Sequence, residues 1–201
     1  MQTVYQRLMS ADGLGESVDR HVFACVIAVC RADPARTLCD GTGLAPDALL
    51  ALFATYFPGC RDILHDPATA VPDAEEALEE EDLKRLLLDH RTTGTRPEEA
   101  WLAAIVARRS LGANHLWQDL GLWERSELSG LLTRHFAPLA ARNVDTMKWK
   151  KFFYRQLCQM EGIVICKAPN CAVCDDYAVC FGEEAGDPLL PLANAARMAA
   201  E

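Results

Sequence analysis

Four cysteines near the C-terminal end of the chain have the spacing of a metal-binding loop. Cys166, Cys171, Cys174 and Cys180 form a C-x4-C-x2-C-x5-C run of fifteen residues. An iron–sulfur cluster takes one thiolate ligand per iron, and a cuboidal cluster is small enough for one loop to supply all four ligands. The close, unequal spacing therefore favours an iron–sulfur cluster of the 4Fe-4S type, bound by these four residues.

Two other kinds of metal site also use four cysteines. Zinc modules usually separate two short-spaced pairs by roughly 15–20 residues, and that separation is missing here. Plant-type two-iron ferredoxins share the first spacings, but their fourth cysteine is remote and their sheet architecture is not indicated by this sequence. Two alternatives stay open, a zinc-stabilised interaction module and a simple iron–sulfur electron carrier.

Three further side chains are candidate ligands. Cys158 precedes Cys166 by eight residues and offers a spare thiolate. His115 stands four residues before Asp119 on an expected helical turn, so that both side chains can face one point. His135 lies on a leucine-rich helix face. The alternative for both histidines is a packed, hydrogen-bonded core residue.

The remaining cysteines do not suggest a second site. Cys25 and Cys30 repeat the C-x4-C spacing, but residues five apart on a helix diverge by about 140°. We expect these two, with Cys39 and Cys60, to bind no metal. A disulfide framework is not expected either, because the nine cysteines are an odd number and residues 1–14 lack the features of a secretory signal.

One basic stretch stands out in an acidic chain, between residues 148 and 155. Its aromatic residues Trp149, Phe152 and Phe153 recur at the i, i+3, i+4 spacing of a buried helix face, so its cations are expected to point outward. They are candidates for docking an acidic partner or attracting an anion, with a plain solvated helix face as the alternative. The cations are Lys148, Lys150, Lys151 and Arg155.

The apolar spacing along the chain predicts a mostly α fold, a compact helical domain with a C-terminal cysteine-rich loop. Two polar pairs, Asp73 with Glu76 and Thr95 with Glu98, have the spacing of helix capping boxes. Only residues 163–165 suggest a strand. Helices are expected near residues 17–33, 46–57, 74–90, 97–111, 128–136 and 145–160.

The length of 201 residues suits one hydrophobic core with appended ends. We expect an N-terminal extension over residues 1–16, a helical domain over 17–182 with the metal-binding loop at 166–180, and a loosely attached tail over 183–201. The chain has 29 acidic and 20 basic residues, a net charge of −9 that argues against general nucleic-acid binding. Its longest apolar run, residues 22–30, is too short to span a membrane, which takes about 20 residues.

The cysteine run and its surroundings resemble the NifQ family. The chain shares the C-x4-C-x2-C-x5-C signature and the sequences HLWQDLG at 115–121, MKWKKF at 147–152, YRQLC at 154–158 and CFG at 180–182. The similarity is dense over residues 101–182 and diffuse before them. It implies a bacterial cytoplasmic protein that processes molybdenum and donates it for synthesis of the iron–molybdenum cofactor of nitrogenase.

The resemblance also implies a molybdenum–iron–sulfur cluster, and delivery to the cofactor assembly scaffold complex together with the nitrogenase iron protein. Molybdenum in such a cluster is bound by sulfide and needs further hard nitrogen or oxygen ligands. Cys180, Cys158, a histidine or a solvent molecule could complete the molybdenum corner. The sequence contains no Ser-His-Asp pattern, phosphate-binding glycine loop or HExxH motif, so we expect a metallocluster carrier or donor more than an enzyme.

Overall fold

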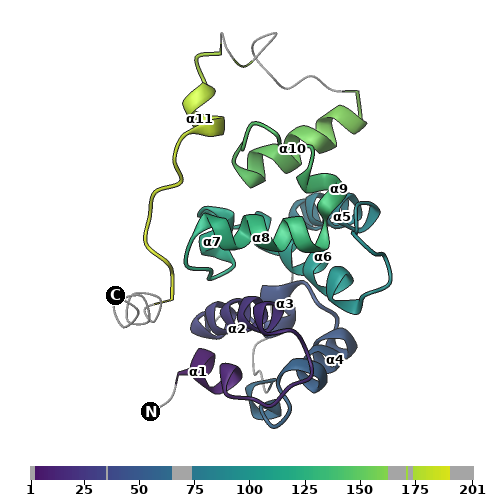
Figure 1. Ribbon diagram of the computed structural model, residues 1–201, viewed down its shortest axis with the longest axis vertical. Helices are drawn as coiled ribbons and strands as arrows, with labels where there is room; N and C mark the ends of the chain where they lie inside the picture. The colour runs from purple at the N-terminus through teal and green to yellow at the C-terminus, as the bar shows by residue number, and fades with distance from the viewer. Residues whose placement is uncertain (1–2, 35, 65–73, 163–170, 172–173, 191–201) are drawn as a thin grey trace.

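The computed structural model describes residues 3–34, 36–64, 74–162, 171 and 174–190, and throughout these residues the regular elements are helices (Figure 1). The prediction of a mostly α protein is confirmed. The predicted strand at 163–165 and the Asp73 end of one predicted capping box lie outside the described residues. Among the described helices, none is long and apolar enough to cross a membrane.

Twelve helical elements follow one another along the described chain. The first six are α1 (Val4–Met9), α2 (Ser17–Ala32), α3 (Leu38–Thr42), α4 (Pro46–Tyr56), a 3-10 turn (Arg61–Leu64) and α5 (Ala74–Asp89). The other six are α6 (Pro97–Ser110), α7 (Leu116–Asp119), α8 (Arg125–His135), α9 (Ala137–Ala140), α10 (Trp149–Met160) and α11 (Tyr177–Phe181).

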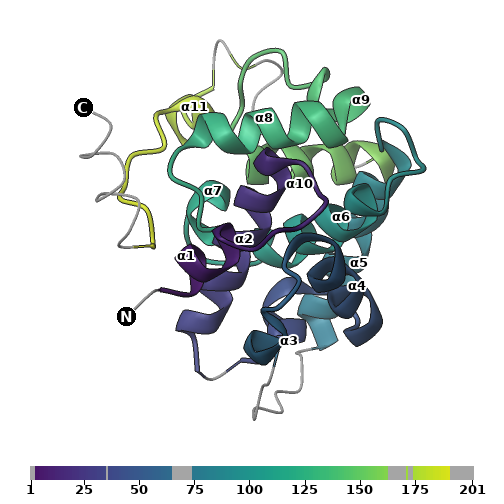
Figure 2. The same cartoon turned by 60° about the horizontal axis from the view of Figure 1, so that its bottom comes forward.

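Helix α6 lies at the centre of the molecule and contacts α3, α5, α7 and α8 (Figures 1 and 2). Its middle residues Leu102, Ala103 and Val106 are fully buried, and alanine there lets neighbouring helices approach closely. Helix α10 contacts α5 on one side of this core. The C-terminal segment that follows α11 runs back past α7 (Figure 1).

Two helix starts differ from the sequence-based expectation. The capping box predicted for Thr95 and Glu98 is wrong, because Arg96 occupies the N-cap of α6 and no side chain caps it. Glu99 instead accepts hydrogen bonds from the backbone of Thr93 and Gly94, at 2.8 Å each. This carboxylate therefore stabilises the preceding loop rather than the helix end.

Helix α10 begins at Trp149, four residues later than predicted. The delay has a local cause, since the side-chain amide of Asn143 pairs with both backbone groups of Met147 at 2.9 Å. This pairing holds the chain in a turn up to Met147 and postpones the first helical residue.

A buried ion pair joins α2 to α8. His135 Nε2 lies 2.8 Å from Asp19 Oδ1, and both side chains are only 1% exposed. Arg134 and Arg96 approach the same carboxylate at 3.1 and 3.5 Å. Burial alone would raise the pKa of Asp19, but the hydrogen bond and charge of His135, together with the two arginines, outweigh it and lower this pKa.

Replacing Asp19 by alanine should lower the free energy of unfolding by about 3–5 kcal/mol at neutral pH, because the cations around it lose a buried partner. The parent should also lose stability as the pH falls below about 4, since the unfolded state then takes up a proton more readily than the folded carboxyl. Urea unfolding followed by circular dichroism measures both effects. Asp47→Ala, at an exposed position of α4, is the control, and an equal acid dependence in parent and Asp19→Ala would contradict the assignment.

Candidate metal centre

The structure describes three of the four predicted cysteine ligands. Cys171, Cys174 and Cys180 are free thiols with half-buried side chains. The Cys174 N–H donates to the Cys171 carbonyl at 3.3 Å, and the Tyr177 N–H donates to the Cys174 carbonyl at 3.1 Å. Cys166 lies outside the described residues. The turn that holds the C-x2-C pair thus leads directly into α11, which carries Cys180.

The backbone of Cys180 is hydrogen-bonded to the residue that precedes α10. Its carbonyl accepts a hydrogen bond of 2.8 Å from the Lys148 N–H, one residue before that helix. Its side chain contacts the edge of the hydrophobic core. Tyr177 and Phe181 stack on one another with ring centroids 4.6 Å apart, which stiffens the short helix between them.

The segment after α11 contacts the helical domain. The Glu184 side chain is only 5% exposed and lies 3.4 Å from His115 Nδ1 and 3.5 Å from Arg125 Nε. Gln118 Nε2 donates to the Asp187 carbonyl at 2.8 Å. Residues 184–187 of the predicted tail are therefore held against α7 and the start of α8, while 191–201 lie outside the described residues.

His115 has a carboxylate partner, but it is not Asp119. His115 is the N-cap residue of α7, with extended backbone angles. Asp119 contacts Asn114 and Lys150 instead, and whether the two side chains face one metal stays a prediction. The contact of Nδ1 with Glu184 leaves Nε2 as the nitrogen that could bind a metal, the usual arrangement of a metal-binding histidine.

The other candidate ligands have different surroundings. His135 is buried, and its Nε2 contacts Asp19. This matches the alternative of a packed, hydrogen-bonded core residue. Cys158 is a half-buried free thiol on α10. Cys25 is buried beside His21, and burial raises the pKa of its thiol well above the ordinary range. A metal role for His135 and Cys158, and the absence of one for Cys25, Cys30, Cys39 and Cys60, stay predictions.

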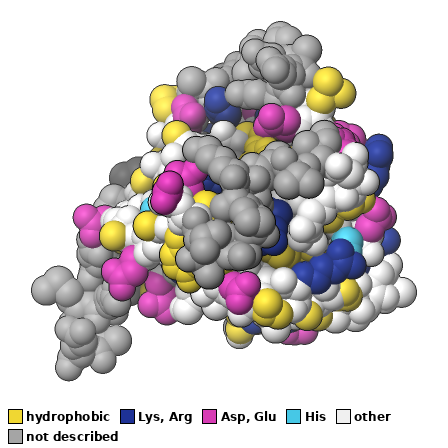
Figure 3. Space-filling model, turned by 90° about the horizontal axis from the view of Figure 1, so that it is seen from above, with side chains coloured by type: hydrophobic (Ala, Val, Ile, Leu, Met, Phe, Trp, Pro, Cys, Tyr) yellow, Lys and Arg dark blue, Asp and Glu magenta, His cyan; other side chains and the backbone are white. Residues whose placement is uncertain are grey.

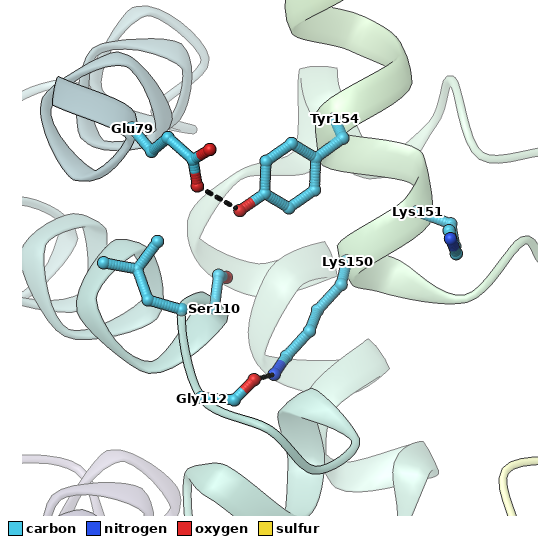
Figure 4. A pocket seen from close by; sticks show the side chains of 7 residues that line it. Glu79, Ser110, Gly112, Lys150, Lys151 and Tyr154 are labelled. Carbon is cyan, nitrogen blue, oxygen red and sulfur yellow. Dashed lines mark hydrogen bonds between the residues drawn. The ribbon is translucent and has the colours of Figure 1, made fainter. Parts of the chain in front are cut away.

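The cations of α10 do not all point outward. The expectation is wrong for Lys150, whose ammonium donates to the Gly112 carbonyl at 2.6 Å, the Asn114 carbonyl at 2.7 Å and Asp119 Oδ2 at 2.6 Å. Asp119 is 4% exposed. Lys151 is exposed and points away from these groups (Figure 4). The predicted burial of Trp149, Phe152 and Phe153 is confirmed.

A pocket of about 430 Å³ lies between α10, α5 and the end of α6 (Figure 4). The Tyr154 hydroxyl donates to Glu79 Oε2 across it, at 3.0 Å. Burial, with the nearby Glu79 carboxylate, raises the pKa of Tyr154 to about 12. Tyr154 therefore remains a protonated donor near neutral pH, and this contact links α10 to α5.

The described residues alone do not complete a metal site. Within them, no three His, Cys, Asp or Glu side chains are arranged to hold a metal ion, and Cys166 is outside them. The chemistry of the donor set nevertheless fits an iron–sulfur cluster, because the described cysteines of the run form no disulfide and are half-buried at the edge of the core. His115 adds a harder nitrogen donor on the same side of α7 as the attached segment.

This is a small helical protein in which a cysteine-rich segment is fastened to one end of α10. A sequence model of the NifQ family matches residues 22–182. The protein NifQ of Azotobacter vinelandii is 52% identical over 152 residues, covering 71% of this chain and 77% of the relative. A NifQ homolog of Sinorhizobium fredii is 40% identical over 178 residues, covering 87% and 76%. The NifQ of Rhodobacter capsulatus is 43% identical over 143 residues, covering 71% and 76%.

The chain belongs to the NifQ family. Membership of this family supports a role in nitrogen fixation. No solved structure matches the chain.

Replacing Lys150 by methionine should lower the free energy of unfolding by about 1–3 kcal/mol, because Asp119 and two backbone carbonyls lose their shared donor. Lys151→Met is the matched control on the next residue and should stay within about 0.5 kcal/mol of the parent, since that side chain is exposed. Urea unfolding followed by circular dichroism measures both changes. Equal stabilities of the two variants would show that the Lys150 contacts contribute nothing.

Proposed function

We propose that this protein binds an iron–sulfur cluster through Cys166, Cys171, Cys174 and Cys180 and donates molybdenum for assembly of the nitrogenase iron–molybdenum cofactor. The observation that carries the proposal is the cysteine run itself, in a chain of the NifQ family. The free, half-buried state of the three described thiols supports it. Ligands buried in the core would hinder metal release, whereas ligands in an attached surface segment allow it.

The thiolates would supply soft ligands for iron, and His115 would supply a harder donor for molybdenum. Glu184 supports this role of His115, since a carboxylate on Nδ1 fixes the tautomer and orientation of the imidazole. Arg125 approaches the second oxygen of the same carboxylate at 3.5 Å and helps to hold its position. Cys158 is a further candidate thiolate, on the helix that precedes the run.

Delivery would require a recipient to reach the cysteine segment. By family resemblance we propose the cofactor assembly scaffold complex and the nitrogenase iron protein as partners. Lys148, Lys151 and Arg155 remain candidate docking residues, whereas Lys150 is occupied by its internal contacts. Seen from above, the described basic side chains that are visible lie among acidic and apolar ones (Figure 3). Any steering of a partner would therefore be modest.

Replacing Cys171 by alanine should remove most of the bound iron while leaving the helical circular dichroism signal unchanged, because the ligand lies outside the helical core. Iron, molybdenum and zinc are measured in protein purified without oxygen. Cys39→Ala is the matched control and should keep the iron content of the parent. Stoichiometric zinc without iron in the parent would favour the zinc-stabilised module, and iron without molybdenum would favour the electron carrier.

Charge reversal at Lys148 and Lys151 should slow cofactor synthesis in a purified assembly system without changing the metal content of the donor. Exposed charges are screened over about 8 Å at physiological ionic strength, so the parent rate should fall with salt and the variant rate should respond less. Two control reversals, Arg61→Glu and Arg85→Glu, match the charge change at exposed positions elsewhere. Equal rates and salt responses in parent and variant would show that these lysines form a solvated helix face with no role in docking.

A further inference from the structure

A second cavity opens directly beside the last cysteine of the run. It has a volume of about 410 Å³ and lies between α10 and the turn that precedes it. Phe181 forms part of its wall, one residue after Cys180. We call it the arginine cleft, and its polar lining consists of Arg142, Asn143, Asp145, Arg155, Gln156 and Gln159.

The two arginines of the cleft lack acidic partners. Within the described part of the chain, Arg142 and Arg155 form no ion pair, although the protein carries an excess of nine negative charges. Elsewhere in the molecule, Arg96 and Arg108 contact carboxylates at 3.1 and 2.6 Å. Within the described residues, the charges of these two arginines are therefore not paired with a carboxylate as those of Arg96 and Arg108 are.

The two glutamines of the cleft do not neutralise the charges of the guanidinium groups. Gln156 Nε2 donates to Gln159 Oε1 at 2.9 Å, and Arg142 makes only a long contact of 3.5 Å with Gln156 Oε1. Asp145 is the carboxylate among the described lining residues, and its side chain is exposed to water. Met147 and Phe152 are buried below them. A low-dielectric wall behind two guanidinium groups strengthens their attraction for an anion.

We propose that the arginine cleft binds a small, doubly charged tetrahedral oxyanion. Guanidinium groups donate planar, paired hydrogen bonds that match the oxygens of such anions. Two guanidinium charges also balance the charge of a dianion. Phe181 in the wall of the cleft is the chain neighbour of Cys180, so the cleft would hold incoming metal oxyanion near that end of the proposed ligand run. This last step rests on the proposed function, whereas oxyanion binding itself does not depend on a cluster.

The test is calorimetric titration of the purified protein with molybdate and, separately, with sulfate, in buffer without reductant. One oxyanion should bind per chain, and its affinity should fall about tenfold or more in Arg142→Ala and in Arg155→Ala, since each loses a charge-assisted contact. Asp145→Asn should bind more tightly than the parent. Arg61→Ala and Arg85→Ala remove the same charge at exposed positions elsewhere and should bind as the parent does.

Iron content and thermal unfolding are measured on the same samples. Weakened binding that is confined to the cleft variants, in protein that remains folded, supports the proposal. The ratio of the affinities for molybdate and sulfate shows whether the cleft selects by size. Equal affinities in parent, cleft variants and control variants would overturn it, as would undetectable binding by the parent. A parent without iron that still binds oxyanion through the arginines would refute the cluster but not the cleft.

Discussion

The contacts of one ammonium group hold together the part of the molecule that carries the candidate site. Lys150 joins the first turn of α10 to the loop between α6 and α7 through two backbone carbonyls and the nearly buried Asp119 carboxylate. Asp119 also accepts from the Asn114 side chain, and its own carbonyl accepts from Arg109. The position of α10 on the central helices is therefore fixed by charge-assisted contacts as well as by apolar packing.

The cysteine segment takes its position from that helix. The Lys148 N–H binds the Cys180 carbonyl, and Arg125 binds the carbonyl of Met147 while approaching Glu184. The first residues of α10, the last cysteine and the attached C-terminal segment thus form one continuous set of contacts. These contacts use backbone groups and charged side chains and leave the thiol of Cys180 uncommitted. A rigid frame around free thiols would suit the proposed binding and release of a metal.

Local patterns predicted the long helices well and the contacts between distant segments poorly. Helices α2 and α4 were predictable because their apolar residues repeat with the helical period and proline marks the start of α4. The outward direction of Lys150 and the Thr95 cap were wrong, because both depend on partners that periodicity does not reveal. Glu184 carried no signal at all, since its partners His115 and Arg125 are some 60 to 70 residues away in the sequence. The cysteine run could be recognised in the sequence because its residues are local, whereas the histidine and arginine surroundings are assembled by the fold.

The segment that carries the cysteine run begins after one end of α10, and Cys180 is hydrogen-bonded at the other end. The chain leaves α10 after Met160 and returns at Cys180 to the residue that precedes the same helix. A helix of 12 residues is about 18 Å long, so Met160 and the attachment point of Cys180 lie at opposite ends of a rigid spacer. Closing a flexible loop costs conformational entropy, and here that cost falls on the folding of the helical body. If the run binds a cluster as proposed, the free energy of binding would include no cost for placing these two attachment points, and it would depend on the ligands more than on the frame.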